Sequence, residues 1–546
     1  MVLNQTDFYK VKETWAISTI LSKQAMERPN SPALQWEDEI PITYNELYLH
    51  CLKLSGGLSK LGVKKNDKVL ILLPNSLEVI YTWISVNFLG AIEVPINIHY
   101  KGSFLVHETN DSQARVAVVH EQYLSRFYEV SNQLKHIEDI IVVGEGEVEF
   151  KNNEQSKWHI HNWEKITNSE PISGPVKAKY SDIAAIMYTS GTTGPSKGVI
   201  MPYGLEGSFA QAIIDIAHLS SDDVYYVCLP LFHANAQFMQ VLPAFIVGAR
   251  VSVWPGFSAS GWLDQIRKIG ATVTNTLGVM CEFIYRQPRR QDDSINPLRC
   301  IFSLPTPKDI AEDFEKRFSV TCIEGYGMTE STVVTYRRLN EPLKLGSAGR
   351  ALDWYEVSIV DPETDELMPP DGIGEIVIRP KYPWTFMKGY HNAPSKTIEA
   401  WRNLWFHTGD SGKMDENGYL YFVDRIKDSI RRRGENITSQ SIENVLNSHP
   451  KIKESAAIAI KSEYGAGGED EVKICVVLKP NEIFSYQDLH KYCEENMPYF
   501  AVPRYIEYVD ELPKTPNQKL RKNVLREQGI TAKTWDREAA GIKVRK

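Results

Sequence analysis

The segment best suited to chemistry is a run of hydroxyl, glycine and lysine residues between positions 189 and 199. It follows an apolar stretch at 182–188 and reads Thr-Ser-Gly-Thr-Thr-Gly-Pro-Ser-Lys-Gly-Val. Glycines let backbone N–H groups turn toward a polyanion, hydroxyl groups donate further hydrogen bonds, and Lys197 supplies a full positive charge. The pattern therefore predicts a phosphate-binding loop, and ATP is the expected ligand.

Other interpretations of the same letters are weaker. A P-loop requires a lysine followed directly by serine or threonine, whereas Lys197 is followed by Gly198. Residues 194–198 do fit Gly-x-Ser-x-Gly, which would make Ser196 a hydrolase nucleophile, but that turn needs a strand directly before the serine and a helix directly after it. Ser196 lies well past the apolar stretch and Pro202 soon follows, so we interpret this match as accidental. A mobile linker is the remaining alternative, and the apolar sequence on both sides argues against it.

Four further segments place aromatic, hydroxyl, carboxylate and basic side chains in a fixed order along the chain. They are residues 324–330, 405–410, 424–425 and 512–519. Each also has a structural interpretation: Glu330 and Asp410 as helix caps, Tyr326 as a core aromatic, and Lys519 as one more charge in a basic tail. Taken singly, the structural interpretation is favoured. All of them together are better explained by one shared site.

Composition restricts the class of protein. The 546 residues are 42% apolar and 24% charged, which is typical of a soluble enzyme with several folding units. The net charge of −8 argues against nucleic acid as a partner. Seven scattered cysteines indicate a reducing compartment, and no secretory signal or uninterrupted apolar span is visible, so we expect a cytoplasmic protein without a membrane span.

The surrounding pattern predicts the elements that position these segments. Short β-rich runs alternate with helix-length amphipathic stretches, first over 68–119 and again over 224–275, where one helix is expected over 236–247. This alternation favours an α/β fold with two doubly wound, largely parallel sheets. Such sheets bind ligands beyond the carboxyl ends of their strands, where the 189–199 loop and the loops after Leu231 and Ile323 are expected to meet.

The pattern changes in the last third of the chain. From about residue 345, short strands such as 374–379 and 418–423 predict a β-rich subdomain. After a basic run at 425–434, a separate α+β pattern follows. We therefore predict a large N-terminal domain over 1–426 and a small C-terminal domain over 427–546. The basic run is equally compatible with a solvated linker and with a functional segment.

The complete set of segments resembles the adenylate-forming superfamily, which comprises acyl-CoA synthetases, firefly luciferase and peptide-synthetase adenylation domains. The resemblance covers essentially the whole chain and is carried by residues 188–199, 229–233, 324–330, 408–410, 424–437 and 519. Within the superfamily, residues 430–437 are most similar to a branch of carnitine or crotonobetaine–CoA ligases. Branch membership is weak evidence for the substrate.

The resemblance implies a role for each matching residue. The β- and γ-phosphates of ATP would contact Thr189, Ser190, Gly191, Thr192, Thr193 and Lys197. The adenine would lie against Tyr326, with Ser303, Glu324, Gly325 and Gly327 around it. Thr329 would reach the α-phosphate and Glu330 would hold Mg²⁺, while Asp410 would bind the ribose with Arg425 nearby.

The small domain is implied to rotate about Lys427. Lys519 would first bridge the substrate carboxylate and the α-phosphate, and the segment with Arg433, Gly434 and Glu435 would then take its place for attack by coenzyme A. This chain departs from the family pattern in three places. Arg433 stands where a glycine is common, and residues 302–307 stand where relatives often carry Gly-Gly-Ala. Residues 201–203 replace the usual Thr-His. The added arginines are expected to meet CoA phosphates.

These observations predict an ATP- and Mg²⁺-dependent carboxylic acid–CoA ligase. The alternatives are a related enzyme with another acceptor, a luciferase-like oxygenase, or a non-catalytic nucleotide-binding regulator. His233 is a candidate catalytic residue, and the acyl pocket is expected near it. The other residues expected around the pocket are Phe232, Gly327, Met328, residues 303–306, Tyr203, Phe209 and Gln237. This lining predicts a compact acid, aromatic or with a second polar or charged group. Arg337 or Arg338 is a candidate partner for a second carboxylate of the substrate, although the preferred interpretation is that each is an exposed surface arginine. The sequence is compatible with a monomer and with a homodimer.

Overall fold

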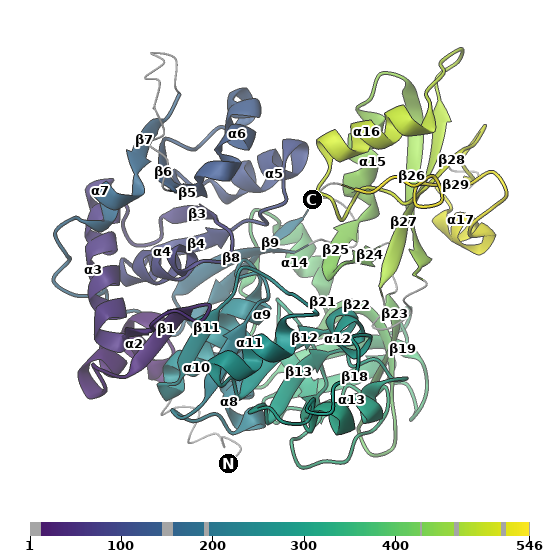
Figure 1. Cartoon of the computed structure of the whole chain (residues 1–546). Coiled ribbons are helices and arrows are strands. Elements are labelled where there is room, and N and C mark those ends of the chain that lie inside the picture. The colour runs from purple at the N-terminus through teal and green to yellow at the C-terminus, as the bar shows by residue number, and fades with distance from the viewer. Residues whose placement is uncertain are drawn as a thin grey trace. The chain divides into compact units, whose positions relative to one another are not determined.

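The computed structural model describes residues 12–144, 157–189, 196–425, 429–462, 469–514 and 520–544 (Figure 1). The chain divides into two compact units. The large unit takes in the chain up to residue 98, residues 109–188 and residues 198–423, and the small unit takes in 99–108, 189–197 and 424–546. The predicted hinge at Lys427 lies outside the described residues, and the predicted boundary between 426 and 427 stays a prediction.

A first sheet follows the predicted alternation of strands and helices. Its strand order is β20 (Gly389–Tyr390), β9 (Lys197–Pro202), β8 (Ile183–Thr189), β4 (Ile92–Pro95), β3 (Lys68–Leu72), β5 (Val116–His120), β6 (Asp139–Val143) and β7 (His159–Asn162). The pairs from β8 through β7 are parallel, and β20 pairs antiparallel with β9. The helices connecting its strands are α4 (Leu77–Phe88), α5 (Gly102–Ser112) and α6 (Glu121–Glu129), with η2 (Ser131–Gln133) after α6.

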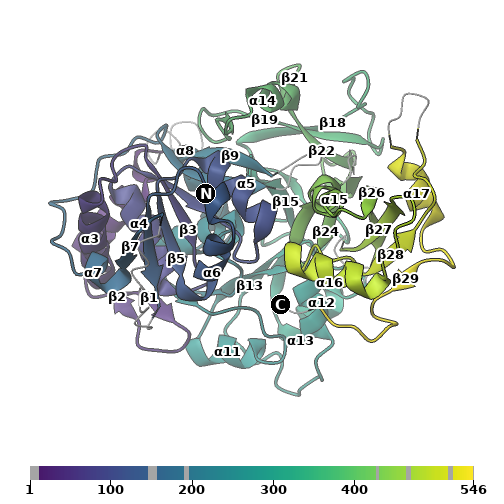
Figure 2. The same ribbon diagram turned by 90° about the horizontal axis from the view of Figure 1, so that it is seen from above.

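Local sequence explains how this layer forms. The helix α3 (Tyr44–Lys60) begins with a capping box, in which Thr43 accepts from the Glu46 N–H and the Glu46 carboxylate accepts from the Thr43 N–H. It packs against α4 and against α7 (Trp163–Thr167), as Figure 2 shows. Every side chain of α4 from Val79 to Phe88 is buried, so this helix has no solvent-facing polar side over that range, although it was expected to be amphipathic. Among the described helices, none is both long and apolar enough to cross a membrane.

A second, largely parallel sheet confirms the predicted fold class. Its strand order is β14 (Thr321–Ile323), β13 (Cys300–Leu304), β12 (Val273–Leu277), β10 (Val224–Val227), β11 (Arg250–Val253), β1 (Pro32–Trp36) and β2 (Ile42–Thr43). The associated helices are η1 (Lys12–Thr14), α2 (Ile17–Glu27), α8 (Tyr203–Ala217), α9 (Ala234–Ala236), η3 (Gln237–Val241), α10 (Leu242–Val247), α11 (Trp262–Ile269), α12 (Gly278–Tyr285) and α13 (Ala311–Phe318). The helix predicted over 236–247 is thus interrupted by the π-helical turn η3.

The β-rich subdomain is present where the turn-rich sequence predicted it. A small sheet contains β15 (Gly325–Met328), β16 (Thr332–Tyr336) and β17 (Arg350–Ala351). A larger one contains β18 (Tyr355–Val360), β19 (Gly374–Pro380), β22 (Trp405–Met414), β21 (Trp401–Arg402) and β23 (Leu420–Arg425), with α14 (Pro394–Ala400) beside it. The pairing within these sheets is antiparallel from β15 to β17 and from β18 to β21.

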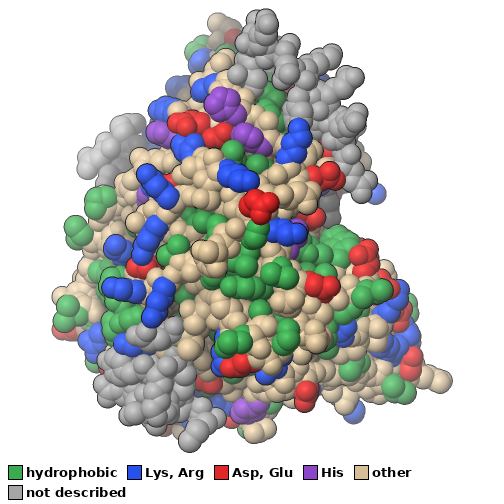
Figure 3. All heavy atoms as spheres, turned by 90° about the vertical axis from the view of Figure 1, so that its left-hand side faces the viewer, with side chains coloured by type: hydrophobic (Ala, Val, Ile, Leu, Met, Phe, Trp, Pro, Cys, Tyr) green, Lys and Arg blue, Asp and Glu red, His purple; other side chains and the backbone are tan. Residues whose placement is uncertain are grey.

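Figure 3 shows that basic, acidic and apolar side chains are interspersed on one face of the protein.

The small unit has a core of its own. A hairpin of β24 (Ser429–Arg432) and β25 (Glu435–Thr438) precedes a sheet of β26 (Ile452–Lys461), β27 (Asp470–Leu478), β28 (Tyr505–Tyr508) and β29 (Trp535–Asp536). Its helices are α15 (Ser439–Asn447), α16 (Tyr486–Asn496) and α17 (Lys522–Gln528). Apolar side chains such as Leu446, Ile474 and Leu489 are fully buried between them. This is the α+β pattern predicted for the C-terminal part of the chain.

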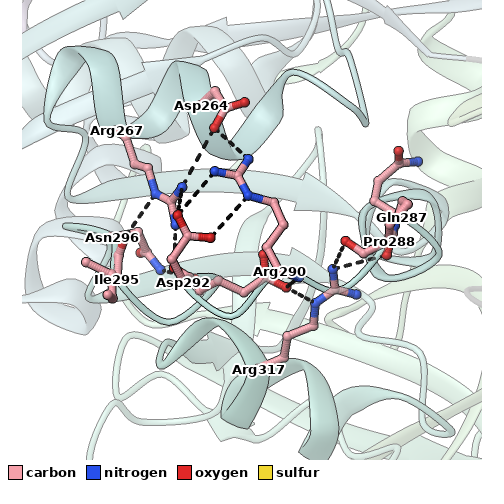
Figure 4. Close-up of polar contacts among 10 residues, drawn as sticks. Asp264, Arg267, Gln287, Pro288, Arg290, Asp292, Ile295, Asn296 and Arg317 are labelled. Atoms are coloured by element: carbon pink, nitrogen blue, oxygen red, sulfur yellow. Dashed lines mark hydrogen bonds and ion pairs between the residues drawn. The ribbon is translucent and has the colours of Figure 1, made fainter.

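An ion-pair network holds the connection between α12 and β13 (Figure 4). The guanidinium of Arg317 lies 2.7 Å from the Asp293 carboxylate, and only 4% and 5% of these side chains are exposed. Arg317 also donates to the backbone carbonyls of Tyr285, Gln287 and Pro288. The buried Arg317 therefore holds the connection between α12 and β13 in place. This connection leads directly into β13, the strand that carries Ser303.

We expect Asp293→Ala to destabilise the protein strongly, because it leaves a buried arginine without its counter-ion. The expected cost is about 3–5 kcal/mol, measured as a lower midpoint of urea-induced unfolding. The matched control is Asp264→Ala, whose carboxylate is 61% exposed and pairs with the 44% exposed Arg290. That variant should unfold almost like wild type. Equal shifts for both variants would contradict the assigned role of the buried pair.

Candidate active site

The predicted adenine and ribose residues meet in the large unit. The Tyr326 hydroxyl, on β15, donates to Oδ2 of Asp410, on β22, at 2.7 Å across 84 residues of sequence. The Asp410 N–H in turn donates to Thr408, and the Tyr326 ring stacks on Phe422. A carboxylate has acceptor capacity for several donors, so this contact still leaves Asp410 able to bind a diol.

Two glycines of this segment are required by the backbone. A Cβ on Gly327 would lie 2.2 Å from the Thr332 carbonyl oxygen, and one on Gly325 would lie 2.7 Å from that of Thr335. Only glycine therefore lets β15 approach β16 this closely. The sequence predicted these glycines beside the nucleotide, and the structure gives them this packing role.

Glu330, the candidate Mg²⁺ ligand, is held by a residue that sequence reasoning missed. Its carboxylate is almost fully buried, and Oε1 accepts from the Tyr390 hydroxyl at 2.9 Å. Tyr390 lies on β20, which pairs with β9 opposite Val199, and burial raises the pKa of its phenol. The segment around Tyr390 carries no chemical signature that would have selected it from the sequence. A buried tyrosine hydroxyl needs a partner, and Glu330 provides one here. Thr329, one residue before Glu330, is partly exposed.

Glu324 and Ser303 lie deeper than the sequence suggested. Ser303 is fully buried, and its hydroxyl lies 3.2 Å from both the Pro305 carbonyl and the Cys281 sulfur. Burial raises the pKa of Glu324 to about 8, although the charge of Lys308 opposes this shift. Both side chains are therefore buried, and their predicted contact with adenine stays a prediction.

The loop after β10 carries the predicted acyl-pocket residues Phe232 and His233. Both are partly exposed and their rings lie 4.6 Å apart. The His233 carbonyl accepts from the Gln237 N–H, so that α9 and η3 follow directly.

Arg337 does not fit the preferred interpretation of an exposed side chain. It is buried, pairs with Glu315 and donates to a backbone carbonyl, which leaves Arg338 as the candidate for a second carboxylate.

The phosphate loop is described only at its ends. Thr189 is the last residue of β8 and Lys197 the first of β9, and the Thr189 hydroxyl donates to the Lys197 carbonyl at 3.5 Å. The predicted phosphate ligands Ser190, Gly191, Thr192 and Thr193 lie outside the described residues, as does Lys519. Arg425 is the last residue of β23. Because a strand and not a helix follows Ser196, the nucleophile-turn interpretation of this serine is excluded.

Helix α5 holds the end of the phosphate loop, which the sequence did not indicate. The Ser196 hydroxyl donates to Oε1 of the buried Glu108 at 2.7 Å, and Nε2 of His107 lies 2.8 Å from the Ser196 carbonyl oxygen. One turn later, Asp111 of the same helix accepts from the Tyr188 hydroxyl at 2.7 Å. These contacts fix the residue next to Lys197.

We expect Glu108→Ala to lower kcat/KM for ATP about 10- to 100-fold, the effect of losing one hydrogen bond to a buried charged group. The expected change is mainly in KM, since Glu108 would position the loop without touching the reacting atoms. Glu108→Gln keeps an acceptor oxygen and should retain most activity. Asn110→Ala, on the same helix but bonded to residues 133 and 135, is the matched control. An unchanged KM in Glu108→Ala would contradict this role.

The hairpin of the small unit has a two-residue turn at Arg433 and Gly434. Both have positive φ, +55° and +80°, which defines the turn type that normally requires glycine or asparagine. Both backbone N–H groups donate to the Glu469 carboxylate, at 3.0 Å for Gly434. Glu469 was not predicted, and its carboxylate pairs with both N–H groups of a turn in which Arg433 takes a conformation that glycine adopts more readily.

The three turn residues selected from the sequence are accessible to solvent, whereas the neighbouring Arg432 is buried. Arg433 is exposed, with its guanidinium 5.2 Å from the centre of the Tyr499 ring, while Gly434 and Glu435 are half-buried. Arg432 is 1% exposed, pairs with Glu471 at 2.8 Å and donates to backbone carbonyls of residues 500 and 502. Arg432 is therefore not accessible to a CoA phosphate in this structure, and the expected contact between Arg433 and CoA stays a prediction.

Comparison with known proteins agrees with this geometry. The family model described as AMP-binding enzyme matches residues 21–391, and that of the AMP-binding enzyme C-terminal domain matches residues 441–519. The chain belongs to the AMP-binding enzyme family. A crotonobetaine/carnitine–CoA ligase of Salmonella heidelberg (strain SL476) is 33% identical over 474 residues, which cover 85% of this AMP-binding enzyme and 89% of that protein.

Solved structures lead to the same class. An o-succinylbenzoate CoA synthetase from Bacillus subtilis superposes with a TM-score of 0.80 at 25% identity, covering 95% of this chain and 99% of that one. A fatty acyl CoA synthetase from Mycobacterium tuberculosis has a TM-score of 0.67 at 26% identity, with 95% and 99% covered. These relatives confirm the predicted fold and the prediction that this AMP-binding enzyme is an ATP-dependent acid–CoA ligase.

Proposed function

We propose that this AMP-binding enzyme joins a compact carboxylic acid to coenzyme A in two half-reactions. In the first, a carboxylate oxygen attacks the α-phosphorus of ATP, the bond to the bridging oxygen of the β-phosphate breaks, and pyrophosphate leaves. In the second, the CoA sulfur attacks the acyl carbon, the bond to AMP breaks, and the thiol proton passes to solvent. The observation that carries this proposal is the direct bond between Tyr326 and Asp410, two signature residues that are distant in sequence.

The described residues suit the nucleotide part of this reaction. Asp410 would accept the ribose hydroxyls while it keeps its bond to Tyr326, whose ring would face the adenine. Thr329 would contact the α-phosphate, where charge develops during attack. Lys197 and Thr189, at the two ends of the phosphate loop, would meet the outer phosphates.

The residues around Glu330 fit Mg²⁺. Among the residues that the structure describes, no group of three or more His, Cys, Asp or Glu side chains could hold a metal ion by itself. Mg²⁺ in nucleotide-dependent enzymes needs only one or two carboxylates, with phosphate oxygens and water completing the shell. Glu330 would supply that carboxylate, and Tyr390 holds it in place. Bound there, Mg²⁺ would offset the negative charge of the phosphates.

The small unit would contribute one segment to each half-reaction. Lys519 would offset the repulsion between the substrate carboxylate and the α-phosphate during the first. The turn of Arg433, Gly434 and Glu435 would serve the second, with the exposed Arg433 available to a CoA phosphate.

The acid itself is proposed to be compact. The predicted pocket wall includes Tyr203 and Phe209, which are buried, and the Phe209 ring lies 6.2 Å from that of Phe238. Such a lining leaves room for a short chain or a ring. Relatives named for crotonobetaine or carnitine and for o-succinylbenzoate act on different acids, so the family alone does not select one.

The test is a panel of carboxylic acids assayed for pyrophosphate exchange and for AMP release. Exchange should occur without CoA for at least one compact acid, and stoichiometric AMP release should require CoA. Oxygen-dependent light emission would favour the luciferase-like alternative. ATP binding without exchange for any acid would favour a non-catalytic regulator.

A further inference from the structure

Two glutamates that the proposed reaction does not use are buried in the large unit. Glu93 lies on β4 and Glu206 on α8, and neither side chain is exposed at all. Fully buried carboxyl groups are rare because removing them from water is costly unless they are paired. Such groups therefore call for a specific partner or a function.

Glu93 has one partner, and that partner is a predicted acyl-pocket residue. Nε2 of Gln237 lies 2.8 Å from both carboxyl oxygens of Glu93, which fixes the orientation of the amide. The other end of the amide, Oε1 of Gln237, is buried without a hydrogen-bond partner among the described residues. Gln237 also begins the π-helical turn η3, and such turns occur frequently at functional sites.

Glu206 has no hydrogen-bond partner within the described part of the chain. Both of its oxygens are buried and unbonded, and so is the hydroxyl of Tyr203, one turn earlier on α8. Helix α8, which carries Tyr203 and Glu206, packs directly against η3, which begins at Gln237. Besides burial, the charge of Glu93 also contributes to raising the pKa of Glu206. Among the described residues, both oxygens of Glu206 and Oε1 of Gln237 therefore lack donors, and the Tyr203 hydroxyl lacks a partner as well.

This cluster lies where the tail of an acyl group is expected. Gln237 is bonded through its N–H to the His233 carbonyl, and Phe209, three residues after Glu206, faces Phe238 of η3. Tyr203, Phe209 and Gln237 are the residues expected from the sequence to contribute to the acyl pocket. Neither glutamate was among them.

We propose that Glu206 and Gln237, with Glu93 holding the Gln237 amide, recognise a primary or secondary ammonium group at the far end of the acid. This inference rests on the proposed function and names its substrate class. An ammonium N–H can donate to the unbonded oxygens, and its positive charge balances the carboxylate that forms when Glu206 loses its proton to solvent on binding. A trimethylammonium group has no N–H to donate, and an alkyl end leaves every acceptor unpaired.

The electrostatics agree with a site that becomes charged only when occupied. Burial raises the pKa of Glu206 well above its usual value and that of Glu93 to about 8. An incoming ammonium group favours the ionised form of a neighbouring carboxyl group. A buried carboxyl group without partners also weakens the fold, so replacing Glu206 by methionine should raise the midpoint of thermal unfolding.

The experiment measures kcat/KM for pyrophosphate exchange with three acids at each of several chain lengths: an ω-amino acid, its N-trimethyl derivative and the unsubstituted alkanoate. At the best length, wild type should prefer the amino acid over both others by about 10- to 100-fold. Glu206→Met should remove this preference while exchange with the alkanoate continues. Asp215→Asn, a partnered carboxylate on the same helix, is the matched control and should leave the preference unchanged.

The outcomes separate this inference from the function on which it rests. A wild-type preference for the alkanoate or for the trimethyl acid would overturn the inference, as would an unchanged preference in Glu206→Met. Exchange with no acid of any kind would instead overturn the proposed function. A higher unfolding midpoint for Glu206→Met shows that the variant is folded, so that lost discrimination cannot be ascribed to unfolding.

Discussion

Glu330→Gln should lower the rate of pyrophosphate release by about 10²- to 10³-fold, the typical effect of removing one preorganised charge from a reacting site. Glutamine has nearly the same shape, and its carbonyl oxygen can still accept from the Tyr390 hydroxyl that lies 2.9 Å from Glu330. The variant therefore removes the negative charge and leaves the packing intact. The rate should be measured at saturating acid and ATP over a titration of Mg²⁺, and the concentration of Mg²⁺ for half-maximal rate should rise.

Tyr390→Phe is the matched control for this prediction. It removes the hydroxyl that orients the carboxylate but keeps the charge and the buried ring, so the loss should be smaller, about 10-fold. Both proteins should have unfolding midpoints close to that of wild type. A wild-type rate and Mg²⁺ dependence in Glu330→Gln would show that the metal is held elsewhere.

Lys519→Ala should slow formation of the acyl-adenylate by about 10²- to 10³-fold. The reason is electrostatic: the attacking carboxylate and the α-phosphate are both anions, and a lysine bridging them offsets their repulsion. Pyrophosphate exchange measures this step alone. Thioester formation from acyl-adenylate supplied in advance should proceed at nearly the wild-type rate, because that step does not bring two anions together.

Lys427→Pro should have the opposite effect to Lys519→Ala, because it should block the second half-reaction and spare the first. Proline fixes φ and restricts the residue before it, so a hinge that must rotate between the half-reactions should be blocked. Pyrophosphate exchange should be retained and thioester formation lost. If Lys427→Pro makes thioester at the wild-type rate, the hinge lies elsewhere. If Lys519→Ala loses both half-reactions equally, Lys519 acts on more than carboxylate attack.

Much of the fold was predictable because it depends on local patterns. Alternation of apolar strands with amphipathic helices predicted the parallel sheets, and a change to short strands with turn residues predicted the β-rich subdomain. Apolar spacing shows which face of an element is buried, and turn residues show where it ends. The interruption of one predicted helix by η3 was not predictable, because a π-helical turn changes the period without changing the composition.

The candidate site was predictable where chemistry depends on residue type within one short segment. The hydroxyl, glycine and lysine run, Glu330 and Asp410 were all selected in this way. Their partners were not, since Tyr390, Glu108 and Glu469 come from segments that carry no chemical signature of their own. Each contacts its partner across 35 or more residues of sequence.

The sequence by itself determined the class of chemistry, because the side chains that bind phosphate, diol and metal must be present and their order along the chain is readable. Only the tertiary structure decided which polar groups are paired and which are buried. Arg337 and Arg432 looked like accessible cations and are buried in ion pairs, while Glu206 looked unremarkable and is buried without a hydrogen-bond partner among the described residues. The reason is physical: the energy of a charge depends on its surroundings, and those surroundings come from elements that packing alone brings together.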